Sequence, residues 1–337
     1  MSVYKLSCRV QIDNYVADFA SEIEINQSYK DLGSTCVIKL PRKLMIGKKK
    51  ITEWLKGGMP VKVEYGYDGN LRTEFTGYVS RFKPSIPIEI LCEDEFYQLR
   101  QKQIPVFRAN GVSIGALLTQ IFERTGLMDI QIAPGYDVLD FKIPIFQAGG
   151  TAMEMIEDLK EKYGLFGYFV GKVFHVGPPF QNKDASSYKS NVYKIGTNVI
   201  SHDLTKAEAA NIRIGVTFVA NVSGKITSVT VGDQDGYKIK KTLVGSAGPT
   251  TDKGPSTPKQ LEDRALAYLA SIRYDGLQGK LTSFNIPLAE MGDRAEIRDP
   301  EGLFGNDYDG VYSIVSIKKT YGVGGIRREV ELGPLEP

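Results

Sequence analysis

The chain has 337 residues, 42% hydrophobic and 24% charged, which is the composition of an ordinary globular protein with room for two or three domains. Basic residues number 42 and acidic residues 40, so the net charge of +2 gives no electrostatic reason to expect nucleic acid as the main partner. No apolar run approaches the roughly 18 residues that a bilayer-spanning helix needs, and three widely spaced cysteines, Cys8, Cys36 and Cys92, predict buried free thiols and no disulfide framework.

The N-terminal part of the chain carries the alternation that is typical of β-strands. Apolar and polar residues alternate over 61–67 and again over 71–75, and Asp68 and Gly69 between them tolerate a left-handed turn. These two runs predict a β-hairpin. A further strand is expected over 86–92, with Pro87 near its start, where a missing amide N–H does least harm.

Three amphipathic helices are expected, each with one apolar stripe that must pack on a sheet. Their expected terminal residues are Ser113 and Gly126 for the first helix, Thr151 and Glu154 as a capping box for the second, and Thr257 and Pro258 for the third. Short β runs after the first two helices predict a compact α/β section between about residues 104 and 179.

From Val192 onward the pattern is again that of strands. The clearest are expected over 216–219, 226–231, 312–317 and 326–332. The segment 245–257 is rich in Gly, Pro, Ser and Thr and is expected to be a mobile loop.

A pattern near the N-terminus returns near the C-terminus. Gly58 opens an alternating strand over 58–63, followed by an aromatic-x-Gly motif at 75–77 and a second strand. Gly292 opens a similar strand over 292–297, followed by the corresponding motif at 308–310. This repeat indicates that the chain carries two similar β barrels, one at each end.

The residues predict no catalytic, cofactor or metal site. Ser201, His202 and Asp203 are adjacent, so their side chains point in different directions and cannot form a hydrolase triad by themselves. His175, the other of the two histidines, lies in an expected strand and is predicted to be structural. The run 233–236 resembles the start of a calcium loop, but Thr242 stands where the bidentate glutamate should fall, so a β-turn explains it better.

Two other motifs have structural interpretations. The glycine-rich run 322–325 lies between two expected strands and lacks the following helix of an anion-binding loop, so it predicts a hairpin. The acidic run Glu93, Asp94 and Glu95 is expected to be the solvated end of the preceding strand. The surplus of 18 tyrosines hints at an assembly role, because tyrosine is favoured in strands and at interfaces.

Five stretches, taken in order and spacing over nearly the whole chain, resemble a known family of proteins. They are 38–42 leading to 57–67, then 75–79 with 87–94, then 159–164, then 198–204, and finally 292–293 with 310–314 and 325–330. Together they resemble the hub proteins of phage tail baseplates, a group that includes the late control protein D family and the N-terminal hub part of the type VI secretion spike protein VgrG.

The resemblance implies a mainly β (α+β) fold with two related β-barrel tube domains and an inserted α/β section. The expected domains are residues 1–103, 104–180 and 190–337, the last with a helix near 257–273. The resemblance also implies a non-enzymatic homotrimer without cofactors, in the baseplate of a phage tail or contractile injection machine assembled in the bacterial cytoplasm. Its expected partners are the spike, the tail tube or its initiator, and the tape-measure protein, without specific nucleic-acid binding or membrane insertion.

Two rival functions remain open. A tail-associated cell-wall hydrolase requires two facing carboxylates, for which Glu93 or Asp94 meeting Glu290 or Asp293 are the candidates. A carbohydrate- or receptor-binding β module requires exposed aromatic platforms, and the single tryptophan, Trp54, counts against it.

Overall fold

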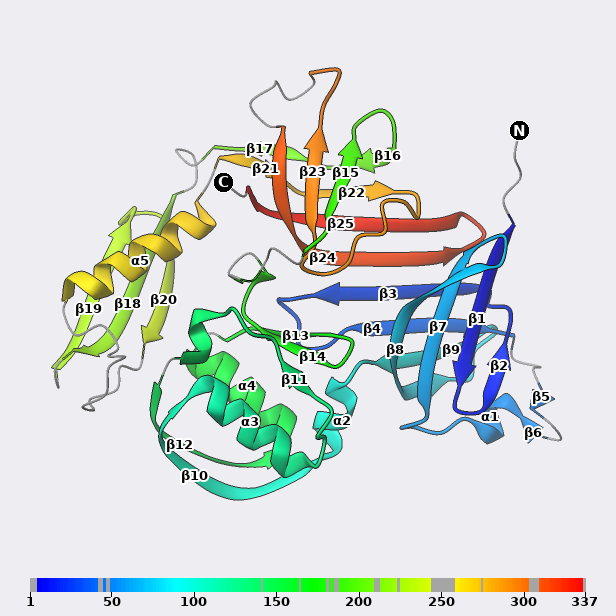
Figure 1. The fold of residues 1–337 in the computed structure, drawn as a ribbon, viewed down its shortest axis with the longest axis horizontal. Helices are drawn as coiled ribbons and strands as arrows, with labels where there is room; N and C mark the ends of the chain where they lie inside the picture. The colour runs from blue at the N-terminus through cyan, green and yellow to red at the C-terminus, as the bar shows by residue number, and fades with distance from the viewer. Residues whose placement is uncertain are drawn as a thin grey trace.

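The computed structural model describes residues 5–41, 45–46, 49–140, 142–163, 165–179, 182, 184, 188–208, 213–222, 225–243, 258–273, 275–302 and 309–335. A 13-stranded sheet runs through the centre of the molecule, and smaller units attach to it (Figure 1). The predicted mainly β class is therefore confirmed. The cap expected at Thr257 and the loop expected over 245–257 lie outside the described residues.

The strands from the first part of the chain form what we call the N-terminal sheet half. They are β1 (Leu6–Ile12), β2 (Tyr15–Ala17), β3 (Glu22–Ser28), β4 (Thr35–Leu40), β7 (Pro60–Tyr67), β8 (Asn70–Lys83) and β9 (Ile88–Glu93). The predicted hairpin is confirmed, because β7 pairs with β8 and the turn residues Asp68 and Gly69 have φ values of 53° and 79°. Short strands β5 (Met45–Ile46) and β6 (Lys49–Lys50) lead to α1 (Ile51–Trp54).

The inserted α/β section has its own hydrophobic core. It contains α2 (Phe96–Gln101), β10 (Gln103–Ser113), α3 (Ile114–Thr125), β11 (Gln131–Ile132), the 3-10 turn η1 (Asp137–Asp140), β12 (Lys142–Thr151), α4 (Ala152–Tyr163), β13 (Gly167–Val170) and β14 (Val173–Val176). Ser113 caps α3 by accepting from the Ala116 amide, and Gly126 ends it in a left-handed conformation. The capping box of α4 is also confirmed, with Thr151 and Glu154 accepting from each other's amides.

The strands of the last part of the chain form the C-terminal sheet half. They are β15 (Ser190–Lys194), β16 (Val199–His202), β22 (Lys280–Ser283), β23 (Arg294–Arg298), β24 (Gly310–Gly322) and β25 (Gly325–Leu335). Beside β16 and β22, the short strands β17 (Thr205–Ala207) and β21 (Gly276–Gln278) pair with each other. The glycine run that follows β24 forms the predicted hairpin, in which Gly322 lies opposite Gly325.

A fourth unit is inserted into the C-terminal sheet half, which the sequence did not separate from the second barrel. It contains β18 (Ile214–Val222), β19 (Lys225–Gly232), β20 (Tyr237–Leu243) and α5 (Pro258–Ile272), and it has a core of its own. Pro258 occupies the first helical position as predicted, and Leu261, Ala265 and Leu269 face the sheet. The run 233–236 forms the predicted turn, closed by the Gly236 amide and the Asp233 carbonyl at 3.3 Å.

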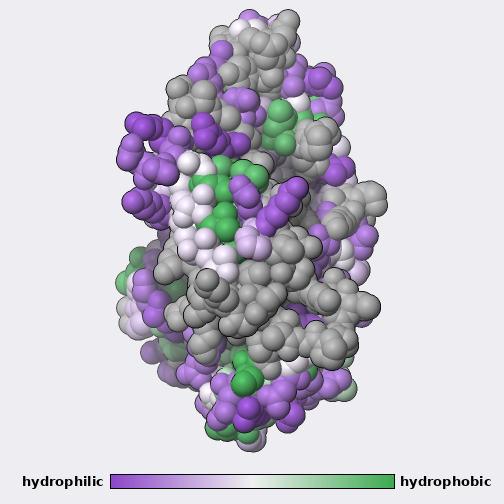
Figure 2. Space-filling model, turned by 90° about the vertical axis from the view of Figure 1, so that its left-hand side faces the viewer, coloured by the Kyte–Doolittle hydropathy of each residue, from purple (hydrophilic) through white to green (hydrophobic). Residues whose placement is uncertain are grey.

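The fourth unit lies at the left-hand end of Figure 1, and Figure 2 looks onto that end. Among the coloured residues of this face, hydrophilic side chains predominate, with small separate hydrophobic patches between them. In the described parts of the chain no helix combines the length and the hydropathy that crossing a bilayer requires.

The two sheet halves have the same strand order. In space the N-terminal strands run β1-β7-β8-β9-β4-β3, and the C-terminal strands run β15-β23-β24-β25-β22-β16. When the short strand β2 is left out and the other strands are numbered along the chain, both halves have the order 1-4-5-6-3-2. The first pair differs in direction, since β1 and β7 are antiparallel whereas β15 and β23 are parallel.

The glycines of the sequence repeat occupy equivalent places in the two halves. Gly58 and Gly292 both have positive φ, of 83° and 89°. The Gly58 amide donates to the carbonyl of Val79 at 2.8 Å, and the Gly292 amide donates to the carbonyl of Ile314 at 3.4 Å. Return bonds from the amides of Val79 and Ile314 reach the residues that follow the two glycines. The repeat that the sequence indicates is thus one of structure.

Candidate functional site: the seam between the sheet halves

The two sheet halves join where β3 pairs with β24, and we call this junction the seam. The pairing is antiparallel and extends from Ser28 opposite Ser316 to Ile23 opposite Tyr321. At the seam the sheet continues without an edge, so the backbone groups of both strands find ladder partners. In Figure 1 the seam lies at the centre, with β3 directly beneath β24.

Side chains also cross the seam. Tyr321 and Ile326 come from the C-terminal half but are buried in the core of the N-terminal half. The rings of Tyr321 and Tyr65 lie 5.5 Å apart, and Tyr321 is 8% exposed. On the outer face Lys318 pairs with Glu24 at 2.9 Å, where both side chains keep part of their exposure to water. The two halves therefore share one of their hydrophobic cores.

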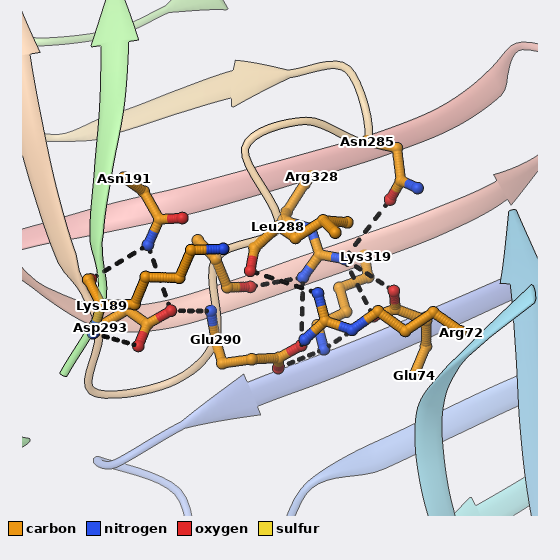
Figure 3. A network of polar contacts seen from close by, with 11 residues as sticks. Arg72, Glu74, Lys189, Asn191, Asn285, Leu288, Glu290, Asp293, Lys319 and Arg328 are labelled. Atoms are coloured by element: carbon orange, nitrogen blue, oxygen red, sulfur yellow. Dashed lines mark hydrogen bonds and ion pairs between the residues drawn. The ribbon is translucent and has the colours of Figure 1, made fainter. Parts of the chain in front are cut away.

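A buried network of ionic side chains lies across the seam (Figure 3). Glu74 of β8 accepts two bonds from Arg328 of β25, at 2.9 and 3.0 Å, and pairs with Lys319 of β24 at 3.1 Å. Lys319 also reaches Glu290 at 2.6 Å, and Glu290 pairs with Arg72 at 2.8 Å. The side chains of Glu74, Lys319 and Arg328 are at most 1% exposed. Each buried charge therefore faces an opposite charge from the other sheet half or from the loop that carries Glu290.

The charges must remain paired, because taking an isolated ion out of water costs several kcal/mol. Burial by itself lowers the pKa of Arg328, but the neighbouring carboxylates Glu74 and Glu290 outweigh this effect and raise the pKa overall. The guanidinium thus stays charged. Such a network adds little to the net free energy of unfolding. Arrangements in which the two halves separate or shift in register would leave buried charges unpaired and are therefore unfavourable.

A second polar cluster holds the loop that delivers Glu290. The Asp293 carboxylate accepts from the amide of Glu290 at 2.9 Å, from the Asn191 side chain at 3.2 Å and from the amide of Lys189 at 3.2 Å. The β15 segment, the loop and the start of β23 are thereby tied together (Figure 3). Asp293 therefore positions Glu290 in the network.

The carboxylates proposed for a hydrolase are distributed over two structural sites. Glu290 and Asp293 belong to the seam, as described above. Glu93 instead binds Arg100 at 2.5 Å and the hydroxyl of Ser80 at 2.7 Å. Asp94 accepts from the backbone amides of Ser34 and Phe96, at 2.7 and 3.1 Å. The described hydrogen bonds and ion pairs join neither Glu93 nor Asp94 to Glu290 or Asp293.

The expectation that residues 93–95 form a solvated strand end is wrong. Asp94 is 5% exposed and Glu95 is 8% exposed. The chain turns inward here because the Asp94 carboxylate satisfies the amide that opens α2 and the amide of Ser34 in the loop before β4. The acidic run thus connects the N-terminal sheet half to the α/β section.

The buried position of Asp94 predicts an unusual titration. Desolvation raises the pKa of Asp94 to about 6, although the Ser34 and Phe96 amides oppose the shift. Because the pKa is raised in the folded state, this carboxyl contributes stability at pH values below its unfolded pKa, and the contribution is lost as the pH rises through about 6. Carboxyl carbon-13 NMR should show one aspartate with a midpoint near pH 6, and Asp94→Asn should remove that resonance. A midpoint near the ordinary value of about 4 would contradict this prediction.

The histidines occupy different surroundings. His175 stacks on Tyr168 with ring centroids 4.8 Å apart, and its Nδ1 lies 3.3 Å from the Tyr136 hydroxyl. Burial lowers the pKa of His175 to about 4, so the ring is neutral at pH 7, which fits the predicted structural role. His202 is exposed on β16, and the adjacent Asp203 carboxylate accepts from the Lys280 amide.

The remaining sequence candidates form no metal or catalytic cluster among the described residues. No three metal-binding side chains come together in the parts of the chain that the structure describes. Asp233, from the calcium-like run, pairs with Arg273 at 3.3 Å. A surface pocket of about 430 Å³ has one carboxylate, Glu157, in its lining. The three cysteines are buried free thiols, as predicted.

Sequence reasoning named Glu290 and Asp293, as candidate hydrolase carboxylates, but missed the other charged residues of the seam: Arg72, Glu74, Lys319 and Arg328. A signal for two of them exists, because residues two apart in a strand lie on the same face. Lys319 shares its face with the buried Ile317 and Tyr321, and Arg328 shares its face with the buried Ile326 and Val330. A cation at an inward strand position requires a buried anion. The sequence offers no means of choosing Glu74 as that anion, since it lies 254 residues from Arg328.

Comparison with known proteins supports the fold. No protein-family model and no curated protein matches the sequence. A 43 kDa tail protein of prophage MuSo2 from Shewanella oneidensis is 15% identical, with a TM-score of 0.62 over 97% of each chain. A tail protein from Neisseria meningitidis is 16% identical, with a TM-score of 0.66 over 98% of this chain and 97% of that one.

A third similar structure comes from a secretion system. It is an Escherichia coli component of the type VI secretion system, described as similar in structure to the bacteriophage T4 tail proteins gp27 and gp5. It is 13% identical, with a TM-score of 0.58 over 98% of this chain and 77% of that one. The chain therefore has the fold of phage tail proteins and of a type VI secretion component, which confirms the predicted baseplate-hub resemblance at the level of the fold.

Proposed function

We propose that this chain is the structural hub of a phage tail or of a phage-tail-like contractile injection machine. Three copies form a ring that links the tail tube to the central spike. The observation that carries the proposal is the pair of equivalent sheet halves in one chain. Three copies provide six similar halves, so a threefold ring can match a sixfold tube. The tail proteins of the same fold support this assignment.

The proposed partners follow from a hub's place in a tail. The spike docks on one end of the ring, and the tail tube or its initiator docks on the other, with the tape-measure protein as a further partner. The hub is assembled in the bacterial cytoplasm and resides in the baseplate of the particle. Specific nucleic-acid binding and membrane insertion play no part in this proposal.

We also retain the division into residues 1–103, 104–180 and 190–337 as a proposal. Separate hydrophobic cores in the N-terminal half, the α/β section and the C-terminal half support it. Two details refine it. Phe96 and Leu99 of α2 pack into the α/β core, and the fourth unit has its own core within the last segment.

An assembly role is favoured over the two rivals. A hydrolase would need two facing carboxylates, but all four candidates are engaged in hydrogen bonds or ion pairs within the fold: Glu93, Asp94, Glu290 and Asp293. Trp54 is partly buried against the N-terminal core, where it offers little surface to a sugar. We therefore propose a non-enzymatic function without cofactors.

Two measurements test this function. Mass photometry of the purified chain alone should show a particle of three times the 37.3 kDa chain mass, and adding its spike should raise this mass by that of the bound spike. Zymography on peptidoglycan should show no clearing beyond that of a buffer control. A chain that stays monomeric at micromolar concentration with and without the spike would contradict the hub, and clearing would favour the hydrolase.

A further inference from the structure

The seam is a template for a second junction. Over residues 316–321, strand β24 is paired along both edges, with β25 on one side and β3 on the other. Because the two sheet halves have the same strand order, the strand equivalent to β24 in the N-terminal half is β8, and the strand equivalent to β3 in the C-terminal half is β16. The corresponding pairing of β8 with β16 is missing from the described ladders.

The equivalence of β8 and β24 extends to single residues. Each strand has a register shift against the strand that follows it in the chain. In β8 the shift against β9 lies between Val79 and Arg81, and in β24 a shift against β25 lies between Ile314 and Ser316. Val79 and Ile314 are also the residues bonded to the two repeat glycines. Arg81 is therefore equivalent to Ser316, and Lys83 is equivalent to Lys318.

The edge of β8 beyond this shift lacks a second partner strand among the described residues. Its pairing with β7 ends at Tyr78, so the segment 81–83 is paired with β9 alone. Arg81 and Lys83 are exposed, and Ile86 just after the strand is 81% exposed. Sheet edges of this kind accept another strand.

The segment that contains β16 and β17 is equivalent to β3. The equivalence can be followed from strand to strand through the residues that lie opposite each other. Lys83 lies opposite Glu89 as Lys318 lies opposite Glu329, so Glu89 is equivalent to Glu329. By the same step, Glu89 opposite Lys39 matches Glu329 opposite Thr282, and Lys39 opposite Glu22 matches Thr282 opposite Ser201. Ser201 is therefore equivalent to Glu22. The match continues into β17, where Thr205 lies opposite Gln278 as Asn26 lies opposite Thr35. Strand β16 ends the main sheet, so its outer side is a sheet edge.

We propose that this edge of β8 pairs with the β16–β17 edge of a second copy of the chain, in the register of the seam. In the seam Ser28 lies opposite Ser316, so the equivalent residues Ala207 and Arg81 should lie opposite each other in the new junction. Likewise, Asn26 lies opposite Lys318 in the seam, so Thr205 should lie opposite Lys83. This inference rests on the proposed trimeric hub and specifies its contact between copies.

Charge supports the same register. In the seam, Lys318 pairs with Glu24 at 2.9 Å. The residues equivalent to these are Lys83 and Asp203, which again carry opposite charges. The new junction therefore has a counterpart of the ion pair that flanks the seam.

The proposed junction is compatible with a closed ring. It is head-to-tail, since one copy supplies β8 and the other supplies β16 and β17. Around the ring, junctions within a chain alternate with junctions between chains, and both have the same strand order. The junction covers the β8 edge at residues 81–83 and the outer side of β16 and β17, which are edges of the kind that invite aggregation when left open.

Engineered disulfides test the register in the full-length chain. Directly opposed residues of antiparallel strands have Cα atoms about 4.5–5.5 Å apart, within the range that a disulfide bridges. Lys83→Cys combined with Thr205→Cys should give covalent dimers and trimers on mild oxidation. Lys83→Cys with Ser201→Cys is the matched control, because position 201 is four residues, or about 13 Å, out of register. The natural cysteines are buried, and burial raises the pKa of Cys36 and Cys92, so they stay outside this reaction.

A second control places the two engineered cysteines on different chains. Chains with Lys83→Cys alone, mixed with chains with Thr205→Cys alone, should give dimers only, and neither chain should crosslink by itself. Mass photometry of the reduced variants separates the two proposals. A trimer that crosslinks only in the Ser201 control, or in neither variant, overturns this junction but leaves the hub. A monomer in every sample overturns the trimer and the junction together.

Discussion

Replacing Glu74 by glutamine is expected to lower the free energy of unfolding by about 3–5 kcal/mol. The substitution preserves the shape of the side chain but removes the negative charge that faces Arg328 and Lys319. Both cations are then left in a region with almost no access to water, with Glu290 as the remaining anion. Urea denaturation followed by circular dichroism measures the change.

The same substitution at Glu24 is the matched control. Glu24 also pairs with a lysine across the seam, at 2.9 Å, but its side chain is 31% exposed. A partly exposed pair contributes about 0.2–1 kcal/mol, so Glu24→Gln should cost no more than that. Equal effects of the two variants would show that the burial of Glu74 has no special energetic role. Replacing Glu74, Lys319 and Arg328 together by apolar residues of similar volume should restore most of the loss.

Tyr321→Ala is expected to destabilise the chain by about 3 kcal/mol. Tyr321 belongs to the C-terminal half by sequence, but its ring fills the core of the N-terminal half beside Tyr65. Truncation therefore leaves a cavity in that core and weakens the attachment of β24 to it. Hydrogen exchange should show loss of protection in β1 and β7 as well as in β24, because these strands line the same core.

Tyr237→Ala controls for the loss of a tyrosine as such. Tyr237 is 75% exposed at the start of β20, so its truncation should change the free energy of unfolding by less than about 0.5 kcal/mol. If Tyr321→Ala lowered protection in the C-terminal half alone, the two halves would not share a core in solution. The seam would then be a contact between independent units.

Local features of the fold could be predicted because their causes lie within a few residues. The turn at Asp68 and Gly69, the cap at Ser113 and the capping box of α4 all follow from backbone preferences and short-range hydrogen bonds. The repeat around Gly58 and Gly292 was also visible, because both positions need a positive φ that glycine supplies without strain.

The errors have equally physical causes. The acidic run around Asp94 looked solvated because its charge density suits water, whereas two distant backbone amides make burial possible. The long antiparallel pair of β10 and β12 went unrecognised, since Pro105 and Gly111 interrupt the alternation of β10. The fourth unit was merged with the second barrel because its strands have the same period as those on either side.

By itself the sequence determined where α3 and α4 begin, where the β7–β8 turn lies, which helix faces are apolar, and that two ends of the chain repeat one pattern. Tertiary structure alone decided that β3 meets β24, that Glu74 neutralises two cations from a remote hairpin, and which strand edges lack a partner strand among the described residues. The reason is one of range. Backbone preference and side-chain alternation act over a few residues, whereas strand pairing and the pairing of buried charges depend on which segments meet after the chain has folded.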